Sequence, residues 1–147
     1  MNTKQLDTFF RSFLDIDGFA SSDNALNGIQ VDNDGAAIKK IAFGVDAAME
    51  TYEAAAAINA GMLFVHHGLF WGGQVRISGQ LRQRIKFLLD HNICLYAVHL
   101  PLDQHPKLGN NAVLASLLGL TNIEPFGNYH GKKIGYKPRR RRFANND

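Results

Sequence analysis

The sequence predicts an α/β fold in which a mixed sheet of βα units is flanked by helices. Short apolar runs typical of buried strands alternate with longer amphipathic segments of helical period. Strands separated by helices of this length need crossover connections, which place strands parallel within a helix-covered sheet. With 147 residues, 46% of them hydrophobic and 20% charged, the chain is suited to forming a compact core rather than a disordered polymer.

The first expected element is an amphipathic helix. Its apolar residues recur at spacings of three and four, at Leu6, Phe9, Phe10, Phe13 and Leu14. We expect Thr3 to cap the start of this helix and Gly18 to lie just beyond its end.

The later elements alternate between strands and helices. After a short apolar segment at 29–31 and the turn Asn33-Asp34-Gly35, strands are expected at 38–45, 62–65 and 93–98. Helices are expected at 47–60, 81–90 and 110–118.

The single cysteine and the absence of long apolar runs indicate where in the cell the protein is located. Cys94 stands in an apolar strand, so no internal disulfide forms and a buried, inert thiol is expected. No apolar run reaches the roughly 18 residues of a membrane span, and the N-terminus does not resemble a signal peptide. We therefore expect a cytoplasmic protein with no membrane partner.

Two adjacent histidines follow the second predicted strand. In α/β sheets, ligands bind at the carboxyl ends of strands, which is where His66 and His67 stand. Successive side chains of a strand point in different directions, so each histidine is expected to serve one ion of a closely spaced pair. Alternatively, they are merely polar residues that end a strand.

A second polar cluster follows the third main strand. His99 and Asp103 should emerge at the same sheet edge as His66, and the two carboxylate oxygens of Asp103 suit it to bridge two cations. Alone, an Asp in a Pro-containing loop is more often a turn residue. His99 is interpreted as a partner that orients Asp103 or as a proton carrier, with a ligand or structural role as alternatives. His91 and His105 are expected to be surface residues.

Imidazole and carboxylate ligands together suit Zn, Fe, Mn or Ni without choosing among them. The sequence has no Gly-rich nucleotide loop of the Walker or dinucleotide type and no Gly-x-Ser-x-Gly nucleophile motif. Gly72-Gly73, after Trp71, is expected to form a flexible loop near His67 that closes over a ligand or is a plain turn.

Several ordered motifs together resemble the Nif-three-like family, the type-two GTP cyclohydrolase homologues. They are Asn27-Gly28-Ile29-Gln30-Val31, Val65-His66-His67-Gly68-Leu69-Phe70-Trp71, His99-Leu100-Pro101-Leu102-Asp103, Leu108-Gly109-Asn110-Asn111-Ala112 and Leu114-Ala115-Ser116-Leu117-Leu118-Gly119-Leu120.

This resemblance runs from the first helix to about Tyr136. It implies the N-terminal part of the Nif-three-like fold, two divalent metal ions per subunit and a ring-shaped homohexamer. It also implies that His66, His67 and Asp103 are metal ligands, and that the protein is a GTP cyclohydrolase-like hydrolase of a nucleotide or related cyclic compound. The alternative from another class is a non-catalytic metal-binding assembly or interaction protein.

The C-terminal part departs from the family pattern. Family members are longer and supply a further His and Glu, four residues apart on a helix, which nothing after Asp103 matches. We therefore expect a family domain at 1–136, truncated at its C-terminus and inactive if those ligands are essential.

The basic tail at 137–147 is expected to be a disordered segment outside the family domain. Residues 132–147 hold seven basic residues and one acidic residue, whereas the first 131 hold nine basic and twelve acidic residues. Four consecutive arginines at 139–142 resemble a nucleic-acid-binding patch, but no aromatic residues interleave them. We expect no specific nucleic-acid partner.

Overall fold

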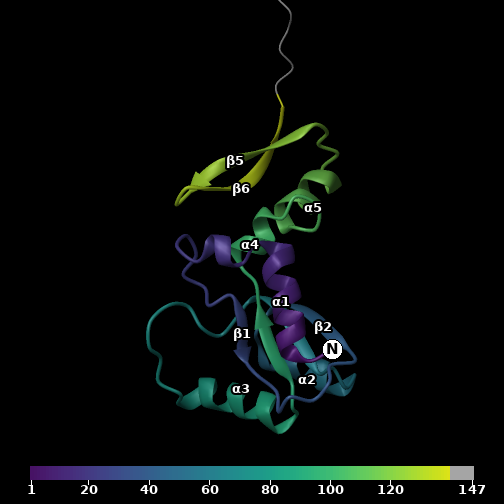
Figure 1. Cartoon of the computed structure of the whole chain (residues 1–147), viewed down its shortest axis with the longest axis vertical. Coiled ribbons are helices and arrows are strands. Elements are labelled where there is room, and N and C mark those ends of the chain that lie inside the picture. The colour runs from purple at the N-terminus through teal and green to yellow at the C-terminus, as the bar shows by residue number, and fades with distance from the viewer. Residues whose placement is uncertain (140–147) are drawn as a thin grey trace, which may run out of the picture. The chain divides into compact units, whose positions relative to one another are not determined.

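The structure is a computed structural model that describes residues 1–139 (Figure 1). The chain divides into two compact units, Met1–Pro101 and a second unit that begins at Leu102. Each unit is described by itself.

The first unit is built on one four-stranded sheet. Its elements are α1 (Thr3–Leu14), the 3-10 turn η1 (Asp17–Phe19), β1 (Gly28–Val31), β2 (Ile41–Asp46), α2 (Met49–Ala57), β3 (Met62–His67), α3 (Gly79–Asp90) and β4 (Cys94–Ala97). The strand order is β1-β4-β3-β2. β2, β3 and β4 run parallel, and β1 joins β4 antiparallel. The predicted mixed α/β sheet is therefore confirmed.

The start of α1 differs from the sequence prediction. Asn2, and not Thr3, is the N-cap: its side chain accepts a hydrogen bond from the Gln5 N–H, and the Gln5 side chain accepts one from the Asn2 N–H. This reciprocal pair satisfies two N–H groups that a bare helix end leaves unbonded. The helix also ends before Gly18, because Asp15 adopts the left-handed conformation at its C-cap.

Helices α2 and α3 cover one face of the sheet. Leu63, Val65 and Leu95 point to that face and are completely buried against Tyr52 of α2 and Leu88 of α3. This cluster buries the apolar run of β3 and holds the strand in place up to the histidines at its end.

Helix α1 covers the other face through aromatic contacts. The ring of Phe10 lies 5.1 Å from both Phe64 of β3 and Tyr96 of β4. The buried Tyr96 hydroxyl donates a hydrogen bond to Asp7 of α1 at 2.9 Å. Because both faces are packed, the carboxyl ends of β3 and β4 are fixed relative to each other.

Cys94 lies at the start of β4 and is completely buried, as expected. Burial, with a smaller contribution from the negative charges of Asp32 and Asp7, raises the pKa of its thiol to about 12. The thiol is therefore protonated and shielded at neutral pH.

The second unit contains helix α5 (Asn110–Leu117) and a hairpin of β5 (Ile123–Tyr129) and β6 (Lys132–Pro138). Helix α4 (Leu100–Gln104) begins at the end of the first unit and continues into the second. The Asn111 side chain donates a hydrogen bond to Ile134 O at 2.6 Å, which ties α5 to β6. The hydrophobic pattern did not predict this hairpin.

None of the helices within residues 1–139 is long and apolar enough to cross a membrane. The predicted boundary at residue 136 falls inside β6, which continues to Pro138. The rest of the basic tail, residues 140–147, lies outside the described part of the chain, so the domain boundary stays a prediction.

Candidate metal centre

The carboxyl ends of β3 and β4 bring three histidines together. The two strands are parallel, with Val65 opposite Ala97, and Val98 N–H extends the pairing by donating to Val65 O at 2.9 Å. His66 and His67 are the last two residues of β3, and His99 follows β4 by two positions. The expectation that His66 and His99 share one sheet edge is met.

The three imidazole rings form a close cluster. One ligand nitrogen from each of His66, His67 and His99 lies within 4.8 Å of the others. The ring centroids of His66 and His67 are 4.5 Å apart, so these neighbours do not diverge as strand alternation predicts.

The first two histidines are oriented by oxygen acceptors. Nδ1 of His66 lies 3.0 Å from Val98 O, and Nδ1 of His67 lies 2.7 Å from Oδ1 of Asp46 on β2. A carbonyl oxygen can only accept a hydrogen bond, so Nδ1 of His66 donates and the neutral ring carries its lone pair on Nε2. A metal-ligating histidine has this arrangement, with its other nitrogen bonded to a carbonyl or carboxylate.

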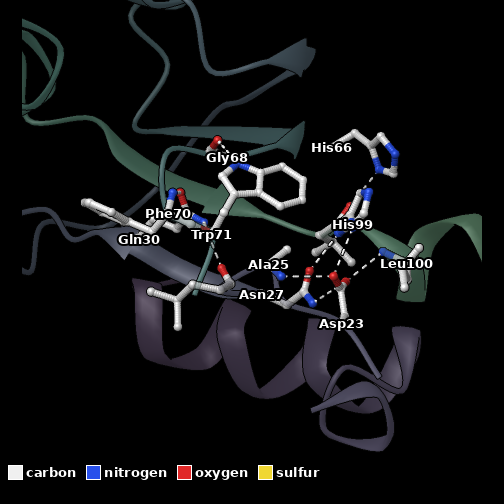
Figure 2. Close-up of polar contacts among 12 residues, drawn as sticks. Asp23, Ala25, Asn27, Gln30, His66, Gly68, Phe70, Trp71, His99 and Leu100 are labelled. Carbon is white, nitrogen blue, oxygen red and sulfur yellow. Dashed lines mark hydrogen bonds and ion pairs between the residues drawn. The ribbon is translucent and has the colours of Figure 1, made fainter. Parts of the chain in front are cut away.

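His99 is held by the same kind of bond from another segment. Its Nδ1 lies 3.0 Å from Oδ1 of Asp23, and its backbone N–H donates to Oδ1 of Asn27 at 2.7 Å (Figure 2). The Asp23 side chain is only 2% exposed. It also accepts hydrogen bonds from the Asn27 side chain and from the N–H groups of Ala25 and Leu100.

These bonds determine the charge of Asp23. Burial alone raises the pKa of the carboxyl group, but the hydrogen bonds from Asn27, His99, Ala25 and Leu100 outweigh burial and lower the pKa below its usual 3.8. Asp23 is therefore an ionised carboxylate that accepts a hydrogen bond from Nδ1 of His99 and fixes the orientation of that ring.

The remaining predicted site residue, Asp103, lies on α4 in the second unit. Its Oδ1 accepts a hydrogen bond from the Asn110 side chain at 2.9 Å. Its role as a ligand stays a prediction. His91 is exposed and caps α3, whereas His105 accepts hydrogen bonds from the following backbone; neither belongs to the cluster.

Sequence reasoning missed Asp23 and Asp46 and gave Asn27 no role. Asp23 lies 76 positions before His99, and no local spacing connects them. Asn27 begins the family-like motif at 27–31, but its hydrogen bond to the His99 backbone depends on the antiparallel pairing of β1 with β4. Only the sheet topology identifies these orienting residues.

The donor set fits a divalent transition metal. Imidazole nitrogens are borderline ligands that suit Zn, Fe, Ni or Cu better than Mg or Ca. All three rings have an oriented Nδ1, as described above, and they are only partly buried, so a ligand can reach them from solvent.

Comparison with known proteins gives the family. The sequence model described as Duf34/NIF3 (NGG1p interacting factor 3) matches residues 1–144. A "GTP cyclohydrolase 1 type 2 homolog" from Treponema pallidum is 53% identical over 135 residues, which cover 92% of this chain and 47% of that protein. Its namesake from Archaeoglobus fulgidus is 48% identical over 136 residues, covering 92% and 54%.

The fold is also found among solved structures. TTHA1606 from Thermus thermophilus superposes with a TM-score of 0.81 and 36% identity, covering 90% of this chain and 56% of that one. The chain thus spans about half the length of the curated relatives that it matches.

Proposed function

The chain belongs to the Duf34/NIF3 (NGG1p interacting factor 3) family, and we propose that it binds divalent metal at the histidine cluster as a metal-dependent hydrolase. The observation that carries the proposal is the meeting of three imidazoles, each oriented through Nδ1 by an oxygen acceptor. That combination is a feature of metal ligands rather than of surface histidines.

His66, His67 and Asp103 are the proposed ligands, and the carboxylate of Asp103 is proposed to bridge a pair of ions. Zn, Fe, Mn and Ni all suit this set. When bound, such ions act as Lewis acids that polarise a carbonyl or phosphoryl oxygen and lower the pKa of water.

His99 is the proposed proton carrier. Its Nδ1 is bonded to the ionised Asp23, which holds the ring in one orientation. Nε2 of His99 then takes a proton from the attacking water and returns it to the leaving group. His99 as a third ligand is the alternative within this proposal.

The proposed substrate is a nucleotide or a related cyclic compound, in keeping with the relatives' name, GTP cyclohydrolase 1 type 2 homolog. A cytoplasmic, ring-shaped homohexamer is the proposed form of the whole protein. Because the chain spans about half of each relative, activity and assembly both belong to the proposal and not to the comparison.

The test is metal content per chain by elemental analysis, together with GTP hydrolysis followed by product chromatography. We expect His67→Ala and Asp103→Ala each to lose bound metal and activity. His99→Ala should keep the metal and lose activity by about 100-fold or more, the usual contribution of a general acid or base. Loss of metal in His99→Ala would make it a ligand. Unchanged metal and hydrolysis in both His67→Ala and Asp103→Ala would overturn the proposal.

A second candidate, a non-catalytic metal-binding assembly protein, is favoured by the apolar surface. Phe43 and Val45 of β2 are 73% and 63% exposed, and Leu117 and Leu118 near the end of α5 are 79% and 67% exposed. Phe43 and Val45 lie two residues apart on an edge strand, and Leu117 and Leu118 are adjacent; exposed apolar side chains that gather in this way mark interaction surfaces. Bound metal without hydrolysis, in a protein that elutes as an oligomer on gel filtration, would favour this candidate.

A further inference from the structure

An aromatic side chain beside the histidine cluster has no part in the metal-site proposal. Trp71, the single tryptophan of the chain, follows β3. Its ring lies 4.8 Å from that of His99, at 75°, and 6.1 Å from that of His67. Figure 2 shows the indole next to His99. A molecule that reaches these histidines therefore also meets the indole.

The indole is fixed in place before any ligand binds. Its Nε1–H donates to Gly68 O at 3.0 Å, and the Trp71 backbone forms an isolated bridge with Ala25. Leu26 N–H donates to Phe70 O at 3.0 Å, which adds a second tie to the same segment. That segment also carries Asn27, whose side chain holds the His99 backbone. Indole and imidazole are thus positioned by one stretch of chain.

Gln30 fixes the turn that leads from the histidines to Trp71. Its Oε1 accepts a hydrogen bond from Leu69 N–H at 2.6 Å, and its Nε2 donates to Leu26 O at 2.8 Å. Gly68 lies so close that a Cβ there would stand 2.4 Å from the Gln30 amide atoms. The conformation after β3 therefore depends on this glycine and glutamine.

Trp71 nevertheless remains 45% exposed, which is unusual for the largest apolar side chain. Since its N–H is already bonded to Gly68 O, the indole needs no further hydrogen-bond partner from a ligand. The residues before and after Trp71, Phe70 and Gly72, line a pocket of about 470 Å³ together with Asn24, Ala25, Leu26 and Gly73. This volume lies within the range of small-molecule pockets.

The loop that follows Trp71 carries a positive charge. Arg76 is the one charged residue at 72–78. Gly72 and Gly73 have φ of +60° and +51°, and Gln74 to Ser78 form no helix or strand. One arginine in the loop that follows an exposed indole suits a ligand that combines a flat ring with phosphate.

We propose that Trp71 is the stacking platform for the purine ring of the ligand acted on at the histidine cluster, which makes it a specificity-determining residue. This inference rests on the proposed function for the reaction, but the binding itself does not need hydrolysis. A flat bicyclic ring gains from offset stacking on an indole.

The test uses guanosine, which has the ring without phosphate, and ribose 5-phosphate, which has phosphate without the ring. Because Trp71 is the single tryptophan, its fluorescence reports the site directly when excited at the red edge of the indole band. We expect guanosine to quench the emission with saturation and ribose 5-phosphate to leave it unchanged. Absence of saturable quenching by guanosine at millimolar concentration would overturn the inference.

Variants tested by equilibrium dialysis with labelled guanosine complete the experiment. Trp71→Ala should weaken binding by about 5- to 100-fold, the effect of losing one base–aromatic stack, and Trp71→Phe by much less. Phe43→Ala, which removes another exposed aromatic ring, is the matched control and should bind as the parent does. Equal affinities of Trp71→Ala and the parent would contradict the inference.

Metal content separates this inference from the proposed function. Trp71→Ala should retain the metal of the parent, and His67→Ala should lose it. Trp71-dependent guanosine binding in a protein that holds no metal would support the stacking site and overturn the hydrolase proposal. Metal binding without guanosine binding would overturn the stacking site and leave the proposed metal centre standing.

Discussion

At the scale of single residues, Asp23 determines where His99 lies. Its two carboxylate oxygens accept hydrogen bonds from one imidazole, one amide side chain and two backbone N–H groups, with 2% of the side chain exposed. Both carboxylate oxygens of Asp23 face hydrogen-bond donors. A side chain that replaces one of these oxygens with an NH2 group must therefore leave at least one of the donors without an acceptor.

Asp23→Asn should therefore lower the free energy of unfolding by about 2–3 kcal/mol, because a buried charge-assisted network is broken. It should also lower hydrolysis by about 10- to 100-fold, the usual effect of losing the residue that orients a functional histidine, whereas the bound metal should be kept, as in His99→Ala. Urea unfolding and product chromatography measure the first two effects, and elemental analysis measures the metal. Asp17→Asn is the control, since Asp17 is 75% exposed in its ion pair with Arg11. Equal stability losses in the two variants would contradict this account of Asp23.

Cys94 gives a second prediction at this scale. The side chain is completely buried and its pKa is raised to about 12, so little thiolate exists at neutral pH and reagents cannot reach it. A thiol reagent at pH 8 should label the folded protein at least about 1000-fold more slowly than the urea-unfolded protein. Labelling at similar rates would show that β4 opens readily and would contradict the packing described for it.

The histidines could be located from the sequence, whereas the groups that orient them could not. His66, His67 and His99 each stand at the end of an apolar run, and parallel strands bring such ends to one edge. Asp23 and Asp46 lie in segments whose place in space depends on strand order, which the sequence pattern does not determine.

At the scale of elements, the capping of α1 is the clearest difference between prediction and structure. Thr3 is a common capping residue, but Asn2 forms the reciprocal pair with Gln5 while Thr3 is buried as the first residue of the helix. The cap matters for the site because α1 packs on β3 and β4 through Phe10.

Asn2→Ala should lower the free energy of unfolding by about 1 kcal/mol, the usual effect of losing an N-cap side chain. The thermal midpoint, followed by circular dichroism, should fall by a few degrees. Lys4→Ala, next to the cap on the exposed side of the first turn, should leave the midpoint nearly unchanged. A greater loss from Lys4→Ala than from Asn2→Ala would contradict the assignment of the cap.

The hairpin of β5 and β6 could not be predicted from hydrophobic pattern. Most of β5 is exposed, and its sequence includes Pro125 and Gly127, which are unfavourable in strands. The turn residues His130 and Gly131 both have positive φ, at 46° and 84°, as a two-residue hairpin turn requires. Histidine is an unusual choice there, so the turn carries a weak sequence signal.

At the scale of the whole molecule, buried side chains that must stay protonated make the free energy of unfolding fall at alkaline pH. Burial raises the pKa of Tyr52 from 10.0 to about 12, and burial with nearby negative charge raises that of Cys94 from 9.0 to about 12. Burial and the hydrogen bond to Asp7 raise that of Tyr96 as well. In each case the folded value lies above the unfolded value, so the unfolded chain loses its proton first as the pH rises. The stability that Tyr52 and Cys94 contribute begins to fall at their unfolded pKa values, 10.0 and 9.0, and is lost by about pH 12, and the contribution of Tyr96 is still falling there.

We therefore expect the free energy of unfolding, measured by urea titration at several pH values, to be level near pH 8 and to fall steadily above pH 9. Each group adds a slope of up to about 1.4 kcal/mol per pH unit within its window. Tyr52→Phe keeps the ring that packs near Phe87 and removes the phenol, so its stability should fall less steeply than that of the parent between pH 10 and 12. Because the hydroxyl bonds only to Ala47 O among the described contacts, the variant should still fold at neutral pH. Parallel curves for parent and variant would mean that Tyr52 has the same pKa in the folded and the unfolded chain. A flat parent curve would mean the same for all three buried groups and would contradict this prediction.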